Sequence, residues 1–303
     1  MLWRRTVCLV IVLALSAGLT VQAWADASLQ TRQIRVNGVD LFYCERGTGA
    51  PVVFVHGAFS DLRYWEPQSL AVAGQYRFIA YTYRYHGRAL WPDDGQQYST
   101  ATHIADLAAF LRQLNAGTVH LVGLSLGGHV ATLVALEHPD LVRSLTVLEP
   151  GFRTLLADLP EAKPVLEERG KAFEPIRTAA KAGDAVRATR MMFDWVNNQG
   201  SGAFDTQPNA VRKMILDNAR TVPLMFSAPP PPAISCATLS GVKTPTLVIR
   251  GAQTRRYYSL IAEVLVRCIP GSQLVTIPHA THWMSHQNPV AFNEALLQFL
   301  ARH

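Results

Sequence analysis

Short apolar runs recur along the chain, separated by stretches in which apolar residues return at helical spacing. Runs rich in Val, Ile and Leu are typical of strands buried on both faces, as in parallel sheets. We interpret these runs as such strands: 52–55, 78–83, 119–122, 145–148, 246–250 and 274–277. Parallel strands need crossover connections, usually helices. The pattern therefore predicts an α/β fold with a mainly parallel sheet covered by helices on both faces.

A hairpin signal precedes the first of these strands. The apolar runs 34–36 and 39–43 flank the dipeptide Asn37-Gly38. Asn-Gly readily takes the positive φ angles of a two-residue hairpin turn. We therefore expect an antiparallel pair of strands to open the sheet at one edge.

The strand pattern is interrupted between residues 152 and 237 by a segment rich in Ala, Arg, Glu and Met, which ends in prolines 229–232. Its helical character predicts a helical lid, inserted into a core formed by residues 26–151 and 238–303. The apolar side chains of this segment face a substrate or form its own core, and both interpretations stay open. They are Met191, Met192, Phe193, Trp195, Met214, Met225 and Phe226.

Composition narrows the class of protein. Of the 303 residues, 49% are hydrophobic and 17% are charged, which excludes a disordered chain and allows a large core. The formal net charge is +6, but Lys and Arg are scattered and form no run of the kind that follows phosphates. We therefore expect a small-molecule substrate and no nucleic-acid partner.

The amino-terminal residues have the pattern of a secretory signal. Arg4-Arg5 precedes an apolar run at 7–19, and Ala23-Trp24-Ala25 places small residues where a signal peptidase reads them. We expect residues 1–25 to be a signal peptide cleaved after Ala25, and the protein to be secreted or periplasmic. An uncleaved anchor is the alternative, but the run is shorter than the roughly 20 residues that span a bilayer. Stable membrane insertion after cleavage is not expected.

Beyond this segment the chain has three cysteines, Cys44, Cys236 and Cys268. A disulfide between Cys236 and Cys268 is conceivable in an oxidising compartment, and free buried thiols are an equal alternative. The sequence does not give the separation of their Cα atoms, on which a bridge depends. No cysteine has metal-ligand spacing to another Cys or His. Neither a metal nor an organic cofactor is expected.

The strand at 119–122 runs into Gly123-Leu124-Ser125-Leu126-Gly127, after which apolar residues recur at helical spacing. This G-x-S-x-G pattern between strand and helix indicates a nucleophile elbow, where glycines leave out side chains that would collide. The Ser125 hydroxyl is then expected at the carboxyl edge of the sheet. The helix behind it brings backbone N–H groups and a positive dipole end, which favour a developing oxyanion.

A serine hydroxyl needs a base to take its proton and a third group to orient that base. His282 follows the last predicted strand on a loop at the same sheet edge, so we expect it to be the base. His279 is its local competitor. His103 is expected on the surface.

An oxyanion hole needs two donors that are in place before charge develops. The N–H of Leu126, directly after Ser125, is expected to be one. The N–H of Ala58, after His56-Gly57, is expected to be the other, with Phe59 as the alternative. His56 is expected to hold this loop through hydrogen bonds.

Taken together, these motifs resemble the α/β-hydrolases of the large lid-bearing group over roughly residues 34 to 301. The motifs that fall in the order of this family are His56-Gly57, Arg84-Tyr85-His86-Gly87, Gly123 to Gly128 and Ala280-Thr281-His282. The group includes esterases, lactonases, carbon–carbon bond hydrolases, cofactor-free haloperoxidases, dehalogenases and epoxide hydrolases. Ser125 stands against the last two activities, because their elbow nucleophile is an aspartate.

The resemblance implies that the orienting acid lies between the serine and the histidine along the chain. In most members it follows the strand that ends here at Arg250, but that loop has no carboxylate and Thr254 stands about where an aspartate is expected. Glu149 closes the strand after the elbow helix, where some members carry the acid, and we assign it the orienting role. Thr254→Ala is expected to change turnover little. Asp158 and Glu263 are more distant substitutes.

The sequence thus predicts an exported serine hydrolase that cleaves an ester or related carbonyl bond of a small, partly apolar substrate. Carbon–carbon bond or lactone hydrolysis on the same fold is one alternative. A ligand-binding protein that retains the pocket without turnover is another. The oligomeric state is left open.

Overall fold

The computed structural model describes residues 29, 31–91 and 93–303. Eight strands form one sheet in the order β1-β2-β4-β3-β5-β6-β7-β8. The strands are β1 (Thr31–Val36), β2 (Val39–Arg46), β3 (Pro51–Val55), β4 (Arg77–Tyr81), β5 (Val119–Leu124), β6 (Val142–Leu148), β7 (Thr246–Gly251) and β8 (Gln273–Ile277). From β4 to β8 all neighbouring strands are parallel, which confirms the predicted mainly parallel sheet.

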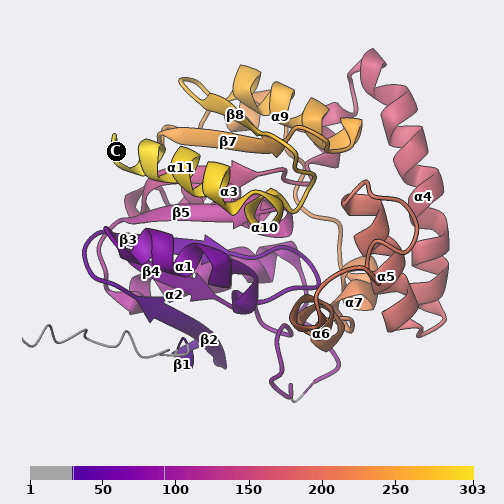
Figure 1. The fold of residues 1–303 in the computed structure, drawn as a ribbon, viewed down its shortest axis with the longest axis horizontal. Coiled ribbons are helices and arrows are strands. Elements are labelled where there is room, and N and C mark those ends of the chain that lie inside the picture. The colour runs from indigo at the N-terminus through magenta and orange to yellow at the C-terminus, as the bar shows by residue number, and fades with distance from the viewer. Residues whose placement is uncertain (1–28, 30, 92) are drawn as a thin grey trace, which may run out of the picture.

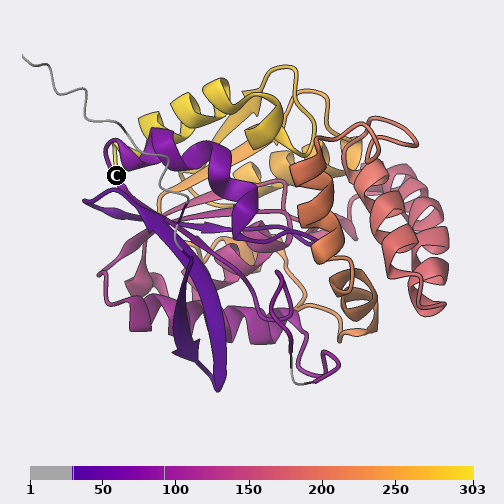
Figure 2. The same cartoon turned by 60° about the horizontal axis from the view of Figure 1, so that its bottom comes forward.

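The predicted hairpin is present at the first edge. β1 pairs with β2 in antiparallel register, with Val36 opposite Val39, and the turn residues Asn37 and Gly38 have φ angles of 46° and 79°. β2 continues antiparallel to β4 and joins the hairpin to the parallel part. Figure 2 shows the hairpin as a twisted ribbon beside the rest of the sheet.

One strand is shorter than predicted. β4 ends at Tyr81 instead of continuing to residue 83. The N–H of Thr82 still donates to the carbonyl of Phe42 on β2 at 2.8 Å, but its Oγ1 accepts the N–H of Leu62 at 3.1 Å. The N–H of Tyr83 donates to His56 at 3.2 Å, so from Tyr83 on a loop group takes the place of a strand partner.

The central strands lie inside the molecule. Every residue of β5 is buried, and so are Val52 to Val55 of β3. Helices cover both faces of the sheet, with α1 and α11 on one face and α2 and α3 on the other (Figures 1 and 2). These core helices are α1 (Glu66–Ala73), α2 (Thr100–Leu114), α3 (Leu126–Glu137), α9 (Arg256–Cys268), α10 (Met284–Gln287) and α11 (Pro289–Leu300). The covered, apolar strands match the runs from which the sheet was predicted.

Between β6 and β7 the chain forms a group of helices, which we call the inserted helices. They are α4 (Lys163–Lys181), α5 (Ala185–Val196), α6 (Asn209–Asp217) and α7 (Thr221–Ser227). Figure 1 shows them together beyond one end of the sheet, at the right of the view. They lie within the segment predicted to be a helical lid. The domain boundaries at 151/152 and 237/238 stay predictions.

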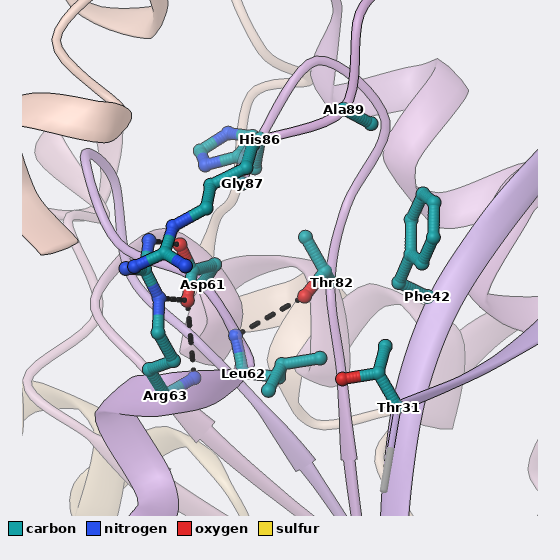
Figure 3. A pocket seen from close by; sticks show the side chains of 10 residues that line it. Thr31, Phe42, Asp61, Leu62, Arg63, Thr82, His86, Gly87 and Ala89 are labelled. Atoms are coloured by element: carbon teal, nitrogen blue, oxygen red, sulfur yellow. Dashed lines mark hydrogen bonds and ion pairs between the residues drawn. The ribbon is translucent and has the colours of Figure 1, made fainter.

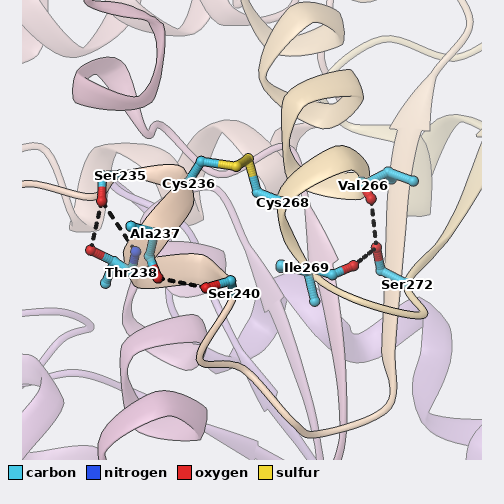
Figure 4. Close-up of a disulfide and its surroundings, with 9 residues drawn as sticks. All are labelled: Ser235, Cys236, Ala237, Thr238, Ser240, Val266, Cys268, Ile269 and Ser272. Atoms are coloured by element: carbon cyan, nitrogen blue, oxygen red, sulfur yellow. Dashed lines mark hydrogen bonds between the residues drawn. A yellow bond between two sulfur atoms is a disulfide. The ribbon is translucent and has the colours of Figure 1, made fainter.

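A disulfide joins Cys236 to Cys268, with their Cα atoms 4.9 Å apart. Cys236 begins the short helix α8 (Cys236–Leu239), and Cys268 is the last residue of α9 (Figure 4). The bridge decides between the two alternatives left open for these thiols. It ties the chain just after the inserted helices to a helix of the core. Cys44 is a free, buried thiol.

The predicted signal peptide, residues 1–25, lies outside the described residues. Within the described part, no helix combines the length and the apolar character needed to cross a bilayer.

Candidate active site

Ser125 stands at the turn between β5 and α3, with φ of 54° and ψ of −113°. A positive φ is strained for a serine, and it persists only where the surroundings enforce it. The N–H of Ser125 donates to the carbonyl of Leu148 at 2.8 Å. A side chain at Gly123 would collide with the backbone of Gly127, and one at Gly127 would collide with the backbone of Val55. The glycines of the motif therefore allow the sharp turn that sequence analysis predicts.

His282 and Glu149 are 133 positions apart in the sequence and are brought into contact by the fold. The ring Nδ1 of His282 lies 2.7 Å from Oε2 of Glu149, and both side chains are buried. A carboxylate can only accept, so Nδ1 carries the proton and Nε2 is left to accept one. Tyr258 stacks on the imidazole with ring centroids 4.2 Å apart, which restricts the ring further.

The Glu149 carboxylate has two further donors. Its Oε1 accepts the N–H of Gly251 at 2.8 Å, and its Oε2 accepts the hydroxyl of Thr254 at 2.9 Å. Thr254 was assigned no role from the sequence, although its position in the loop where an acid was expected pointed to it. Thr254 thus donates to Glu149 from the loop after β7, where the resemblance led us to expect a carboxylate. Glu149 has a φ of 43°, a second strained residue at this sheet edge.

The alternatives to these residues lie elsewhere. His279 is exposed and has a φ of 55°, in the loop before His282. Asp158 is exposed as well. Glu263 pairs with Arg250 and Arg256, each at 2.8 Å. Of the candidates named from the sequence, only Glu149 contacts His282.

The two expected oxyanion donors lie beside Ser125. Ala58 and Leu126 line the same cavity as the serine. Leu126 is the first residue of α3, so its N–H has no acceptor within the helix. A Cβ added to Gly57 would lie 3.5 Å from that of Ser125, so the loop carrying Ala58 passes close to the serine. Phe59, the alternative donor, has a positive φ of 42°.

His56 holds this loop, as expected. Its Nε2 accepts the N–H of Tyr83, so Nδ1 donates to the carbonyl of Gly57 at 2.8 Å. Burial lowers the pKa of His56 to about 4, which keeps the ring neutral.

His103 corrects an expectation, because it is fully buried rather than on the surface. It lies on α2 and lines the cavity that contains Ser125, with its ring 4.6 Å from that of Tyr83 and 4.8 Å from that of Tyr98. The spacing to Leu107 and Leu111, at intervals of one helical turn, was the signal that placed it on the buried face. Burial lowers the pKa of His103 to about 3.

A cavity of about 600 Å³ lies over Ser125, between the sheet edge and the inserted helices. Met192, Met225 and Phe226 line it, whereas Phe193 and Met214 are buried in the core. The apolar residues of the inserted segment therefore divide between the two roles left open by the sequence. A second, smaller space is lined by Ser125, His282 and Trp283.

A separate cavity of about 250 Å³ lies near the first hairpin and includes none of the predicted site residues (Figure 3). Its charged side chains are in ion pairs: Arg63 pairs with Asp61 at 2.6 Å, and Arg63 and Arg88 pair with Asp217, outside the lining, at 2.8 and 2.9 Å. Across residues 29, 31–91 and 93–303, no cluster of three or more His, Cys, Asp or Glu side chains is placed to hold a metal ion.

Comparison with known proteins agrees with the fold. The family described as "Alpha/beta hydrolase family" matches residues 52–295. A 2-(acetamidomethylene)succinate hydrolase of Mesorhizobium japonicum is 25% identical, over 89% of this chain and 95% of the relative. A 2-hydroxy-6-oxo-6-(2'-aminophenyl)hexa-2,4-dienoic acid hydrolase of Metapseudomonas resinovorans is also 25% identical, over 92% of this chain and 93% of the relative.

Among solved structures, a thermophilic esterase from Thermogutta terrifontis is similar, with 26% identity and a TM-score of 0.68. The match covers 90% of this chain and 98% of the esterase.

Proposed function

Because the chain belongs to the alpha/beta hydrolase family, we propose that it is a serine hydrolase that cleaves an ester bond of a small molecule. The observation that carries the proposal is the 2.7 Å contact between His282 and Glu149, next to the cavity that holds the elbow serine. A base oriented by a buried carboxylate is what a serine nucleophile requires.

In the proposed reaction, Ser125 Oγ attacks the ester carbonyl while Nε2 of His282 takes its proton. The N–H groups of Leu126 and Ala58 stabilise the negative charge on the carbonyl oxygen. The carbon–oxygen bond then breaks, His282 passes its proton to the leaving alcohol, and an acyl group stays on Ser125. Water, activated by the same histidine, cleaves this acyl-enzyme and restores the serine.

Labelling with a fluorophosphonate probe tests the nucleophile. We expect the protein to be labelled and to hydrolyse 4-nitrophenyl acetate, and Ser125→Ala to lose both properties. Ser259→Ala, on helix α9, is the control and should retain both. Hydrolysis by Ser125→Ala at the wild-type rate would refute the assignment.

We also propose that the protein is exported. The secretory pattern of residues 1–25 and the Cys236–Cys268 disulfide, a bond that persists in oxidising compartments, support this. Amino-terminal sequencing of the exported protein would contradict the proposal if it began at Met1 rather than after Ala25.

A further inference from the structure

The cavity over Ser125 is lined by charges of a single sign. Arg153, Arg169 and Arg177 line it, and all three come from the inserted segment. Among the described residues that line this cavity, none is an aspartate or a glutamate. A cavity with low-dielectric walls and one sign of charge concentrates ligands of the opposite sign.

The three arginines differ in how they are already engaged. Arg177 pairs with Glu174 at 3.0 Å, so part of its charge is compensated. Arg153 is exposed at the cavity, and Arg169 is half-buried on α4. The guanidinium of Arg169 lies 4.0 Å over the ring of Phe173 and 5.2 Å from the centroid of Tyr257. These two rings hold the guanidinium against the cavity wall.

One hydrogen-bond donor of Arg169 has no described partner. Its Nε is buried and makes no hydrogen bond within the part of the chain that the structure describes. Nε2 of His129, on α3 after Ser125, lines the same cavity and is likewise buried without a hydrogen-bond partner among the described residues. A buried donor without an acceptor costs free energy, and a bound ligand with acceptor atoms would recover it.

A series of aromatic contacts joins Arg169 to the reactive histidine. The ring of Tyr257, beside Arg169, lies 5.0 Å from that of Tyr258, which in turn stacks on His282. Arg153 lines the same cavity as Arg169, Tyr257 and Ser125. The charges of Arg169 and Arg153 also both oppose the rise that burial causes in the pKa of Tyr257. One small molecule in this cavity therefore has Ser125 and the guanidinium groups among its walls.

We propose that the substrate of this site carries a carboxylate, which Arg169 binds, assisted by Arg153, while its ester carbonyl lies at Ser125. The planar guanidinium fork matches a carboxylate in geometry as well as in charge. The substrate class is then an ester that bears a free carboxylate on its acyl or its alcohol part. This inference rests on the proposed ester hydrolysis and adds the substrate class to it.

Two pairs of probes test the inference. Mono-4-nitrophenyl glutarate and its methyl ester differ only in the carboxylate on the acyl side. The compounds 4-acetoxybenzoate and methyl 4-acetoxybenzoate differ in the same way on the alcohol side. We expect the anionic member of at least one pair to have a kcat/KM about 10- to 100-fold higher, as a charge-assisted hydrogen bond would give. High salt should reduce this preference.

Arg169→Met should remove most of the preference, mainly through a higher KM for the anionic ester, and should lower kcat/KM for the neutral ester much less than for the anionic one. Activity on the neutral ester then shows that the variant is folded. Lys171→Met is the matched control, because Lys171 is an exposed cation on the same helix that does not line the cavity. It should leave both rates unchanged.

The outcomes separate the two proposals. Hydrolysis of the neutral esters without preference for either anionic one would overturn the carboxylate inference and leave ester hydrolysis intact. If no ester is cleaved, ester hydrolysis fails, and binding of glutarate alone decides the inference. A rise in melting temperature with glutarate that Arg169→Met abolishes would support it, and no rise in the wild type would overturn it.

Discussion

At the scale of single residues, the site depends on the hydrogen bonds that the buried carboxylate of Glu149 accepts. Glu149 is fully buried and accepts from His282, Gly251 and Thr254. Burying an ionised carboxylate is costly unless hydrogen bonds replace its water. These three donors do so, and they also fix which oxygen faces the histidine. The strained backbone of Ser125 and Glu149 is held by the same sheet edge.

Glu149→Gln should therefore lower kcat for 4-nitrophenyl acetate by about 10³- to 10⁴-fold, as in other triads whose acid is neutralised. The amide has no charge to stabilise the imidazolium and can turn an N–H toward Nδ1, which favours the wrong tautomer. Thr254→Ala removes one of the three donors. From the sequence, Thr254→Ala was expected to change turnover little. Because Thr254 donates to Glu149, we now expect the variant to lower kcat by up to about ten-fold.

Glu263→Gln is the control for this series, because Glu263 pairs with arginines away from the site. Wild-type turnover in a folded Glu149→Gln protein would contradict the role assigned to Glu149. Circular dichroism establishes that each variant is folded.

At the scale of elements, a disulfide follows the inserted helices. The disulfide joins α8 to α9, and it closes a loop with a sequence separation of 32 that contains β7. α9 also carries Tyr257 and Tyr258, which contact Arg169 and His282. The bridge thus fixes the chain that returns from the inserted helices against the helix that supports the histidine.

Replacing both Cys236 and Cys268 by serine should destabilise the protein by about 3–4 kcal/mol, since the unfolded chain gains loop entropy. For a domain of this size the melting temperature should fall by about 5–10 °C in calorimetry. A reductant should lower the melting temperature of the wild type to that of the variant and leave the variant unchanged. Equal shifts in both would show that the bridge is not the cause.

At the scale of the whole molecule, several histidines are buried in neutral form. Burial lowers the pKa of His56 and of His129 to about 4, and that of His103 to about 3, each from an ordinary value of 6.5. As the pH falls below about 6.5, these histidines become protonated in the unfolded chain but stay neutral in the folded protein. Stability is therefore greatest above about pH 6.5 and is lost as the pH falls toward these folded-state values.

His103→Phe should weaken this loss of stability in acid. Its two ring nitrogens have no hydrogen-bond partner within the described residues, and it packs among tyrosine rings, so an apolar ring of similar volume fits. Melting temperatures measured from pH 7.5 to pH 4.5 should fall less steeply than in the wild type. The exposed His279, replaced by Asn, is the control and should leave the slope unchanged. An unchanged slope in His103→Phe would refute the explanation.

The sequence by itself determined the features that depend on neighbouring residues. Hydrophobic period placed the strands, Asn37-Gly38 placed the hairpin, and the glycines around Ser125 placed the elbow. It also predicted that Ser125, Glu149 and His282 lie at the same edge of the sheet, because each follows a parallel strand and the carboxyl ends of parallel strands meet at one edge.

Only the tertiary structure decided the contacts between distant side chains. Glu149 and His282 are 133 positions apart and were paired beforehand through the family resemblance, whereas Thr254, 105 positions from Glu149, was assigned no role. No local pattern encodes such contacts, since they follow from how helices and loops pack around the sheet. Packing likewise gathered three scattered arginines over Ser125, buried His103 and joined Cys236 to Cys268. The elbow is a property of a short stretch of chain, whereas the cavity that it serves is a property of the whole fold.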